Sequence, residues 1–253
     1  MPSLTPVYYI PQGAHHQTTA GPDNETSGLP LRLVPQTTKL ANIDNVDKPQ
    51  WSIGLSSMSS TQANWIGSDE AGKGDYFGPL VVAAVLVDGA LLGPLGQLGV
   101  KDSKRLADAS VERLAGKIRG SCIYAIVPIG PEKYNHLYSK IQNLNRLLAW
   151  GHARAIENIL NREECGYALA DQFGDENFLI SALLSKGRTI QVEQQTGAES
   201  NIAVAAASIL ARAEFLRRLA QLSAKYQMKL PKGASSVVIQ AGKEFITRYG
   251  NER

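Results

Sequence analysis

The sequence predicts an α/β domain in which helices flank a central sheet. Three observations lead to this fold class. Apolar runs of strand length recur between residues 65 and 192, apolar residues at helical spacing recur between and beyond those runs, and the two kinds of segment alternate. Such alternation is typical of a sheet whose faces are covered by helices.

The expected elements follow one another along residues 65–249. The first strand begins at Trp65-Ile66 and soon meets the turn formers Gly67-Ser68. Residues 80–87 are wholly apolar and rich in Val, which predicts a buried strand. Further strands are predicted at residues 122–129, 167–170 and 189–192, and helices at residues 110–119, 144–160, 201–226 and 237–249.

Residues 1–62 differ from the rest of the chain. They are rich in Pro, Thr, Ser, Asn and Gln, and no apolar period persists through them. Such a composition buries too little apolar surface to order itself, so we expect a poorly ordered N-terminal segment. Residues 63–253 are then expected to form one folded domain.

Composition bounds the function only loosely. Hydrophobic residues make up 43% and charged residues 19% of the 253 residues, which is an ordinary globular balance. The net charge of +3 fits a nucleic-acid binder and many metabolic enzymes alike. Cys122 and Cys165 lack the spacing of a zinc site or a disulfide scaffold. We find no secretory signal and no apolar run of membrane-spanning length, so the cytoplasm is expected.

Two adjacent carboxylates, Asp69 and Glu70, precede a glycine-rich stretch. Neighbouring strand residues point to opposite faces, so both acids serve one site only if the chain bends there. Gly72, Lys73 and Gly74 would bring backbone N–H groups and an ammonium close to a phosphate. Carboxylates that can bind a metal ion, next to a lysine that can bind a phosphate, are the groups that metal-assisted phosphodiester hydrolysis needs. The alternative is a solvated turn with incidental charge.

Two further carboxylates occupy positions where functional acids are common. Asp171 ends an apolar strand run, and ligand sites in α/β sheets favour the carboxyl ends of strands. Glu199 immediately precedes a long helix of small residues, which would let that helix approach the sheet closely. The alternative for Asp171 is a cap on the following helix. For Glu199 it is likewise a capping role, favoured by the helix dipole.

In this arrangement the chain resembles the ribonuclease HII/HIII family, and its opening motif is similar to that of the HIII type. Residues 67–79 (GSDEAGKGDYFGP) carry the signature, with Lys73 where the HII type usually has Arg. Other family motifs follow in order at residues 100–104 (VKDSK), 134–135, 143–145, 148–153, 171–173 (DQF), 198–199, 204–212 and 230–235. The resemblance covers residues 65–250.

The resemblance implies an RNase H-like fold with a central mixed sheet, and an endonuclease that hydrolyses the RNA strand of RNA–DNA hybrids. Two Mg²⁺ or Mn²⁺ ions would serve as cofactors, leaving 3′-OH and 5′-phosphate ends. The implied metal ligands are Asp69, Glu70, Asp171 and Glu199. Gly72, Lys73 and Gly74 would contact the ribose and phosphate beside the cut, and Ser103 and Lys104 would hold the backbone of the hybrid duplex.

Two competing functions stay open. One is an HII-type enzyme that cuts at single ribonucleotides in DNA. Lys73 and residues 75–77 argue against this type. The other is a non-catalytic hybrid-binding protein, which would most simply lack at least one of the four acids; all four are present. The histidines, including His136 and His152, are expected to be packing or surface residues without a metal role.

The sequence also departs from the HIII pattern at both ends. HIII proteins usually carry a folded N-terminal hybrid-binding domain, and residues 1–62 look too short and too polar to be a complete one. The family usually continues beyond the position of Arg253 into an ending that contains Lys and His. We therefore expect a fragment or a divergent member, which acts as a monomer.

Overall fold

A computed structural model of the chain describes residues 64–100 and 106–250. The predicted N-terminal segment, Ser103 and Lys104 lie outside the described residues. Within them, a mixed five-stranded sheet has the order β3-β2-β1-β4-β5. The strands are β1 (Trp65–Ala71), β2 (Leu80–Val87), β3 (Ile123–Ile129), β4 (Tyr167–Asp171) and β5 (Gln191–Gln195). The pairs β1–β2 and β2–β3 are antiparallel, whereas β1–β4 and β4–β5 are parallel.

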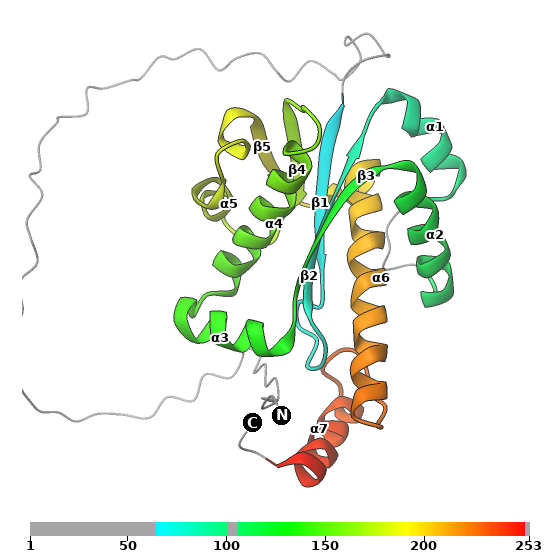
Figure 1. Cartoon of the computed structure of the whole chain (residues 1–253), viewed down its shortest axis with the longest axis vertical. Coiled ribbons are helices and arrows are strands. Elements are labelled where there is room, and N and C mark those ends of the chain that lie inside the picture. The colour runs from blue at the N-terminus through cyan, green and yellow to red at the C-terminus, as the bar shows by residue number, and fades with distance from the viewer. Residues whose placement is uncertain (1–63, 101–105, 251–253) are drawn as a thin grey trace, which may run out of the picture. The chain divides into compact units, whose positions relative to one another are not determined.

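Helices cover both faces of this sheet. They are α1 (Gly89–Gln97), α2 (Asp108–Ser121), α3 (Pro131–Ile141), α4 (Leu144–Leu160), α5 (Glu176–Ala182), α6 (Ile202–Lys225) and α7 (Ser236–Tyr249). Figure 1 shows α3, α4 and α5 on one side of the sheet and α1, α2 and α6 on the other. Helix α7 follows at the far end of α6. None of the described helices is long and apolar enough to cross a membrane.

The strand β2 divides the core into two layers. Every residue of β2 is buried. Val81, Ala83, Val85 and Val87 pack in the layer of α2 and α6. The alternate residues Leu80, Val82, Ala84 and Leu86 pack in the layer of α4. Because both faces of β2 are covered, its sequence is apolar throughout rather than alternating.

The helix α6 lies unusually close to β1. A Cβ atom on Gly67 would stand 2.2 Å from the backbone of both Ala203 and Val204, so only glycine fits there. Ala203, Val204 and Ala205 are themselves buried. The predicted close approach of a small-residue helix to the sheet is therefore present. It seats the start of α6 on the first half of β1, where Trp65 Nε1 donates to Asn201 Oδ1 at 3.0 Å.

Several elements differ from the sequence-based expectation. The strand β1 continues through Asp69 and Glu70 to Ala71, because all seven of its residues pair with β2. The helix α1 was not expected, since its sequence contains three glycines and Pro94. It begins because the Asp88 side chain accepts a hydrogen bond from the Leu91 amide. Helix α5 is too short to show a sustained apolar period. Helix α3 was not predicted with bounds of its own, although Tyr134, Leu137, Tyr138 and Ile141 recur in it at helical spacing.

Candidate active site

The structure places Asp69 and Glu70 in a regular strand, opposite Ala83 and Val82 of β2. The bend that the sequence analysis expected between them is absent. The Asp69 side chain instead folds back, and its Oδ1 atom accepts a hydrogen bond from the Glu70 amide at 2.7 Å. Ser208 of α6 also hydrogen-bonds the Asp69 carboxyl. The two acids keep the alternation of the strand: Asp69 meets Ser208 of α6, and Glu70 meets His152 of α4. Their charges still act on each other.

Asp171 is the last residue of β4, the parallel neighbour of β1. The pairing of these strands runs as far as Ser68 opposite Ala170, so the next residues, Asp69 and Asp171, stand at the same level of the sheet. The Asp171 Oδ1 atom accepts a hydrogen bond from the Ala198 amide at 3.1 Å. The cap of α5 is Asp175, not Asp171. The capping alternative for Asp171 is therefore wrong.

Glu199 lies in a single 3₁₀ turn, Ala198–Ser200, just before α6. The cap of α6 is Asn201, whose side chain accepts from the Ala203 amide at 3.0 Å. Glu199 is thus not the capping residue. Its carboxyl shares a hydrogen bond with the Asp171 carboxyl. Asp69, Glu70, Asp171 and Glu199 accordingly come together where β1, β4 and the start of α6 meet.

The electrostatics of this cluster reflect crowded negative charge. Burial, together with the charges of Glu70 and Asp171, raises the pKa of Asp69 to about 7, although hydrogen bonds to its carboxylate lower it. Burial and the neighbouring Glu199 also raise the pKa of Asp171. Burial alone would raise the pKa of Glu70, but His152 and Lys73 lower it. A divalent cation would relieve the repulsion among these carboxylates.

The donor set fits a hard divalent ion. Mg²⁺ and similar ions prefer carboxylate oxygens together with water and phosphate oxygens. In the present side-chain arrangement, no three His, Cys, Asp or Glu side chains of the described residues gather tightly enough to hold one ion. The acids form two neighbouring pairs, Asp69–Glu70 and Asp171–Glu199.

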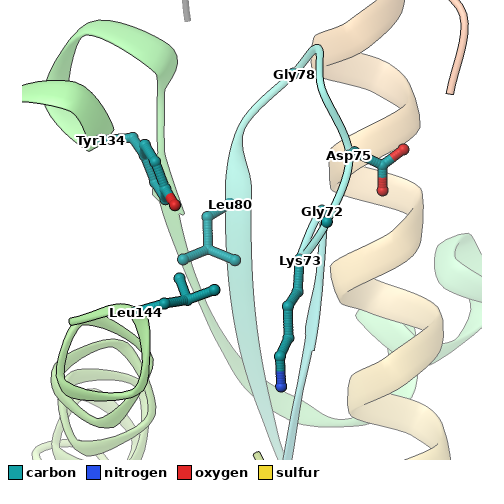
Figure 2. Close-up of a pocket in the computed structure, with 8 residues that line it drawn as sticks. Gly72, Lys73, Asp75, Gly78, Leu80, Tyr134 and Leu144 are labelled. Atoms are coloured by element: carbon teal, nitrogen blue, oxygen red, sulfur yellow. The ribbon is translucent and has the colours of Figure 1, made fainter. Parts of the chain in front are cut away.

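A glycine-rich turn joins β1 to β2 and forms one wall of a pocket. Its lining residues are Gly72, Lys73, Gly74, Asp75, Gly78, Leu80, Tyr134 and Leu144 (Figure 2). Gly72 has φ +88°, and a Cβ atom there would lie 2.1 Å from the Pro79 carbonyl oxygen. The sequence therefore needs glycine at this position to let the chain turn. Figure 2 shows Lys73 reaching back along the strands, while Asp75 points toward α6.

Lys73 connects this pocket with the acids. Its Nζ atom lies 3.5 Å from Glu70 Oε1 and donates a hydrogen bond to the Phe173 carbonyl at 3.4 Å. The side chain is still 38% exposed. A phosphate that entered the pocket would find this ammonium at the border between the turn and the carboxylates.

Three residues of the site were not predicted as site residues from the sequence. His152 was expected to be a packing or surface residue, but its Nε2 atom lies 3.3 Å from Glu70 Oε2. Tyr134 and Leu144 supply the wall opposite the glycine-rich turn. The signal for them was their place in the motifs at residues 134–135, 143–145 and 148–153. Spacing along a helix does not reveal which strand residue a side chain meets.

Comparison with known proteins identifies the family. The family model for ribonuclease HII matches residues 66–253. A ribonuclease HIII of Protochlamydia amoebophila is 48% identical over 188 residues, which is 74% of this chain and 62% of the relative. A ribonuclease HIII of Chlamydia felis is 45% identical over 190 residues, or 74% of this chain and 63% of the relative. The chain thus spans less than two thirds of the length of these relatives.

Solved structures agree in fold. The crystal structure of Bst-RNase HIII in complex with Mn²⁺ has a TM-score of 0.70 at 35% identity, covering 75% of this chain and 64% of that one. Ribonuclease HII of Archaeoglobus fulgidus, solved in complex with PCNA, has a TM-score of 0.62 at 31% identity, covering 74% of this chain and 88% of that one. The predicted RNase H-like fold is confirmed, and the chain belongs to the ribonuclease HII family.

Proposed function

We propose that the chain is an endonuclease that hydrolyses the RNA strand of RNA–DNA hybrids and leaves 3′-OH and 5′-phosphate ends. The observation that supports this most is the meeting of Asp69, Glu70, Asp171 and Glu199 beside the Lys73 turn. Burial and the neighbouring carboxylates raise the pKa of Asp69 to about 7. Such a concentration of negative charge is expected where metal cations bind. The structure of a relative in complex with Mn²⁺ supports the same role here.

The four carboxylates are the proposed ligands for Mg²⁺ or Mn²⁺. The chemistry that a bound pair of ions supplies is activation of a water molecule and stabilisation of the leaving oxygen. The protein's own contribution is to hold the carboxylates at one end of a rigid sheet. Asp69 and Asp171 lie on paired parallel strands, and α6 carries Ser208 to Asp69. Positioned ligands leave little reorganisation for the reaction itself.

The proposed substrate contacts lie on the turn between β1 and β2. Gly72, Lys73 and Gly74 line its pocket and are proposed to meet the ribose and phosphate beside the cut. A contact to the ribose 2′-OH there would distinguish RNA from DNA. Ser103 and Lys104 are proposed to hold the duplex backbone, from outside the described residues.

The proposed working unit is a monomer in the cytoplasm. All four proposed ligands come from one chain, so no second copy is needed to complete the site. Residues 63–253 are proposed to form the catalytic domain, which agrees with the extent of the family match at residues 66–253. Residues 1–62 are proposed to form a separate segment, a remnant of a substrate-binding domain.

Cleavage of end-labelled duplexes in Mg²⁺ or Mn²⁺ tests the proposal. A long RNA–DNA hybrid should be cut in the RNA strand, and the matching DNA duplex should stay intact. Binding of the hybrid without any cutting would indicate a non-catalytic hybrid-binding protein. A DNA duplex with a single ribonucleotide should be a poor substrate. Efficient cutting of that duplex would move the assignment to the HII type.

A further inference from the structure

A buried histidine connects two residues of β1. His152 of α4 is 0% exposed. Its Nδ1 atom lies 2.9 Å from the Ser68 hydroxyl oxygen, and its Nε2 atom lies 3.3 Å from Glu70 Oε2. Ser68 and Glu70 are two residues apart, so both side chains point to the same face of the strand. Both ring nitrogens are therefore used by the strand that carries Glu70.

The chemistry of the two partners determines which ring nitrogen donates and which accepts. A carboxylate only accepts, so the His152 Nε2 atom carries the proton and donates to Glu70. In the neutral ring, Nδ1 then accepts from the Ser68 hydroxyl. Ser68 is itself fully buried, which leaves its hydroxyl dependent on protein partners. Glu70 thus sets the ring tautomer, and the Ser68 hydroxyl satisfies the nitrogen that remains.

The ring is also fixed in position by packing. It stacks on Phe173 with 4.7 Å between centroids and 15° between planes. Phe173 follows Asp171 by two residues, and its carbonyl oxygen accepts from Lys73. At the preceding residue of α4, a Cβ atom on Gly151 would stand 2.7 Å from Val82 Cγ2. Because α4 is seated this tightly on β2, the His152 ring has little room to move.

A purely structural role does not account for these contacts. An apolar side chain would be enough to fill this buried position of α4. An imidazole is buried without a large free-energy cost only if both of its nitrogens are hydrogen-bonded. Both partners of His152 lie on β1, and one of them is a carboxylate of the crowded acidic cluster. The polar ring therefore serves Glu70 rather than the core.

We propose that His152 is a positioning residue, which holds the Glu70 carboxylate in the orientation that binds a divalent ion, while Ser68 hydrogen-bonds the other ring nitrogen and holds the ring in place. The inference rests on the proposed function, because it assumes that Glu70 is a ligand. Partners that orient a ligating carboxylate typically change metal affinity about 10–100-fold when they are removed. Loss of the His152 hydrogen bond should weaken metal binding by that factor.

Calorimetric titration of the full chain with Mn²⁺, without substrate, measures this directly. His152→Met fills the space but cannot donate, so its Kd for Mn²⁺ should rise about 10–100-fold. His152→Gln places an amide N–H near the position of Nε2 and should recover most of the affinity. His136→Met, on an exposed site of α3, is the matched control and should bind like the wild type. The melting temperature in EDTA shows that each variant is folded.

The outcomes separate the inference from the proposed function. If wild-type protein binds no Mn²⁺, the proposed function and the inference both fail. If it binds Mn²⁺ and folded His152→Met binds equally well, only the inference fails. Equal losses in His152→Met and His152→Gln would indicate packing and would also overturn it. Should His152→Met not fold, Ser68→Ala decides: a weaker Kd supports the inference, and an unchanged Kd refutes it.

Discussion

At the scale of single residues, Lys73 has a role that binding measurements can isolate. Its ammonium lies 3.5 Å from Glu70 and is 38% exposed, so a phosphate can reach it. Lys73→Ala should weaken hybrid binding and reduce the slope of log K against log salt by about one unit. Lys117→Ala, on the exposed face of α2, is the control and should leave the slope unchanged. Equal slopes for all three proteins would show that Lys73 does not contact a phosphate.

Some residues of the candidate site can be predicted from local sequence patterns, whereas others depend on contacts between distant parts of the chain. Asp171 ends an apolar strand and Asp69 precedes a glycine-rich turn, so local pattern marks both as candidates and the family resemblance selects them. His152 meets Glu70 across 82 residues of sequence. Its contact depends on how α4 rests on the sheet, which no local period encodes. The bend expected at Asp69 is absent for a related reason, because β1 stays paired with β2 as far as Ala71.

At the scale of elements, Glu157 joins α4 to the turn before β5. Its carboxylate accepts hydrogen bonds from the Gly187 amide at 2.8 Å, the Ser185 hydroxyl at 2.9 Å and the Lys186 amide at 3.1 Å. Glu157→Gln removes one acceptor and should lower the free energy of unfolding by about 1–3 kcal/mol at pH 7. Urea denaturation measures this, with the exposed Glu163→Gln as control.

The difference in stability between the wild type and Glu157→Gln should depend on pH. Burial alone would raise the pKa of Glu157, but its hydrogen bonds lower it below the ordinary value of 4.5. The carboxylate therefore stabilises the fold fully above pH 4.5, and that contribution is lost as the pH falls through the lowered pKa. The stability difference between wild type and Glu157→Gln should shrink below pH 4.5. A difference that grew on acidification would contradict the assigned hydrogen bonds.

Helix α7 supports the end of the molecule that carries the glycine-rich turn. Phe245 packs on Tyr226 and Tyr249 at 4.8 and 4.9 Å between ring centroids, and on Phe77 of the turn at 6.4 Å. Phe245→Ala should cost about 3–5 kcal/mol of stability by urea denaturation. Val237→Ala, at a site 66% exposed on the same helix, should change it by less than about 0.5 kcal/mol. Similar small effects for both would mean that α7 is not docked.

Periodicity predicted the long elements well and the short ones poorly. The helix at residues 144–160 was expected at the bounds that α4 has, and the apolar run at residues 80–87 is β2. The strand expected at residues 189–192 is displaced, because residues 187–189 form a 3₁₀ turn and β5 spans Gln191–Gln195. Helix α1 depends on its Asp88 cap and on packing against α6, which override a composition of turn formers.

At the scale of the whole molecule, the division between the N-terminal segment and the catalytic domain stays a prediction. The described core and all four proposed ligands lie within residues 64–250. A chain that begins at residue 62 should therefore keep its kcat on saturating hybrid. Its KM should rise if the removed residues supplied phosphate contacts, which is the signature of lost uniform binding. A large fall in kcat, in protein that circular dichroism shows to be folded, would place the boundary elsewhere.

The rate of hybrid cleavage at saturating Mg²⁺ by Asp69→Asn, compared with wild type, tests the central claim most directly. Asp69 is the most buried of the crowded acids by its exposed fraction of 7%, and the change to Asn alters its charge with little change in shape. The exposed Glu112→Gln on α2 removes the same charge away from the site. If the four carboxylates hold the catalytic ions, Asp69→Asn should cut at least about 100-fold more slowly, and Glu112→Gln should match wild type. Wild-type rates for both variants would place the chemistry elsewhere in the molecule.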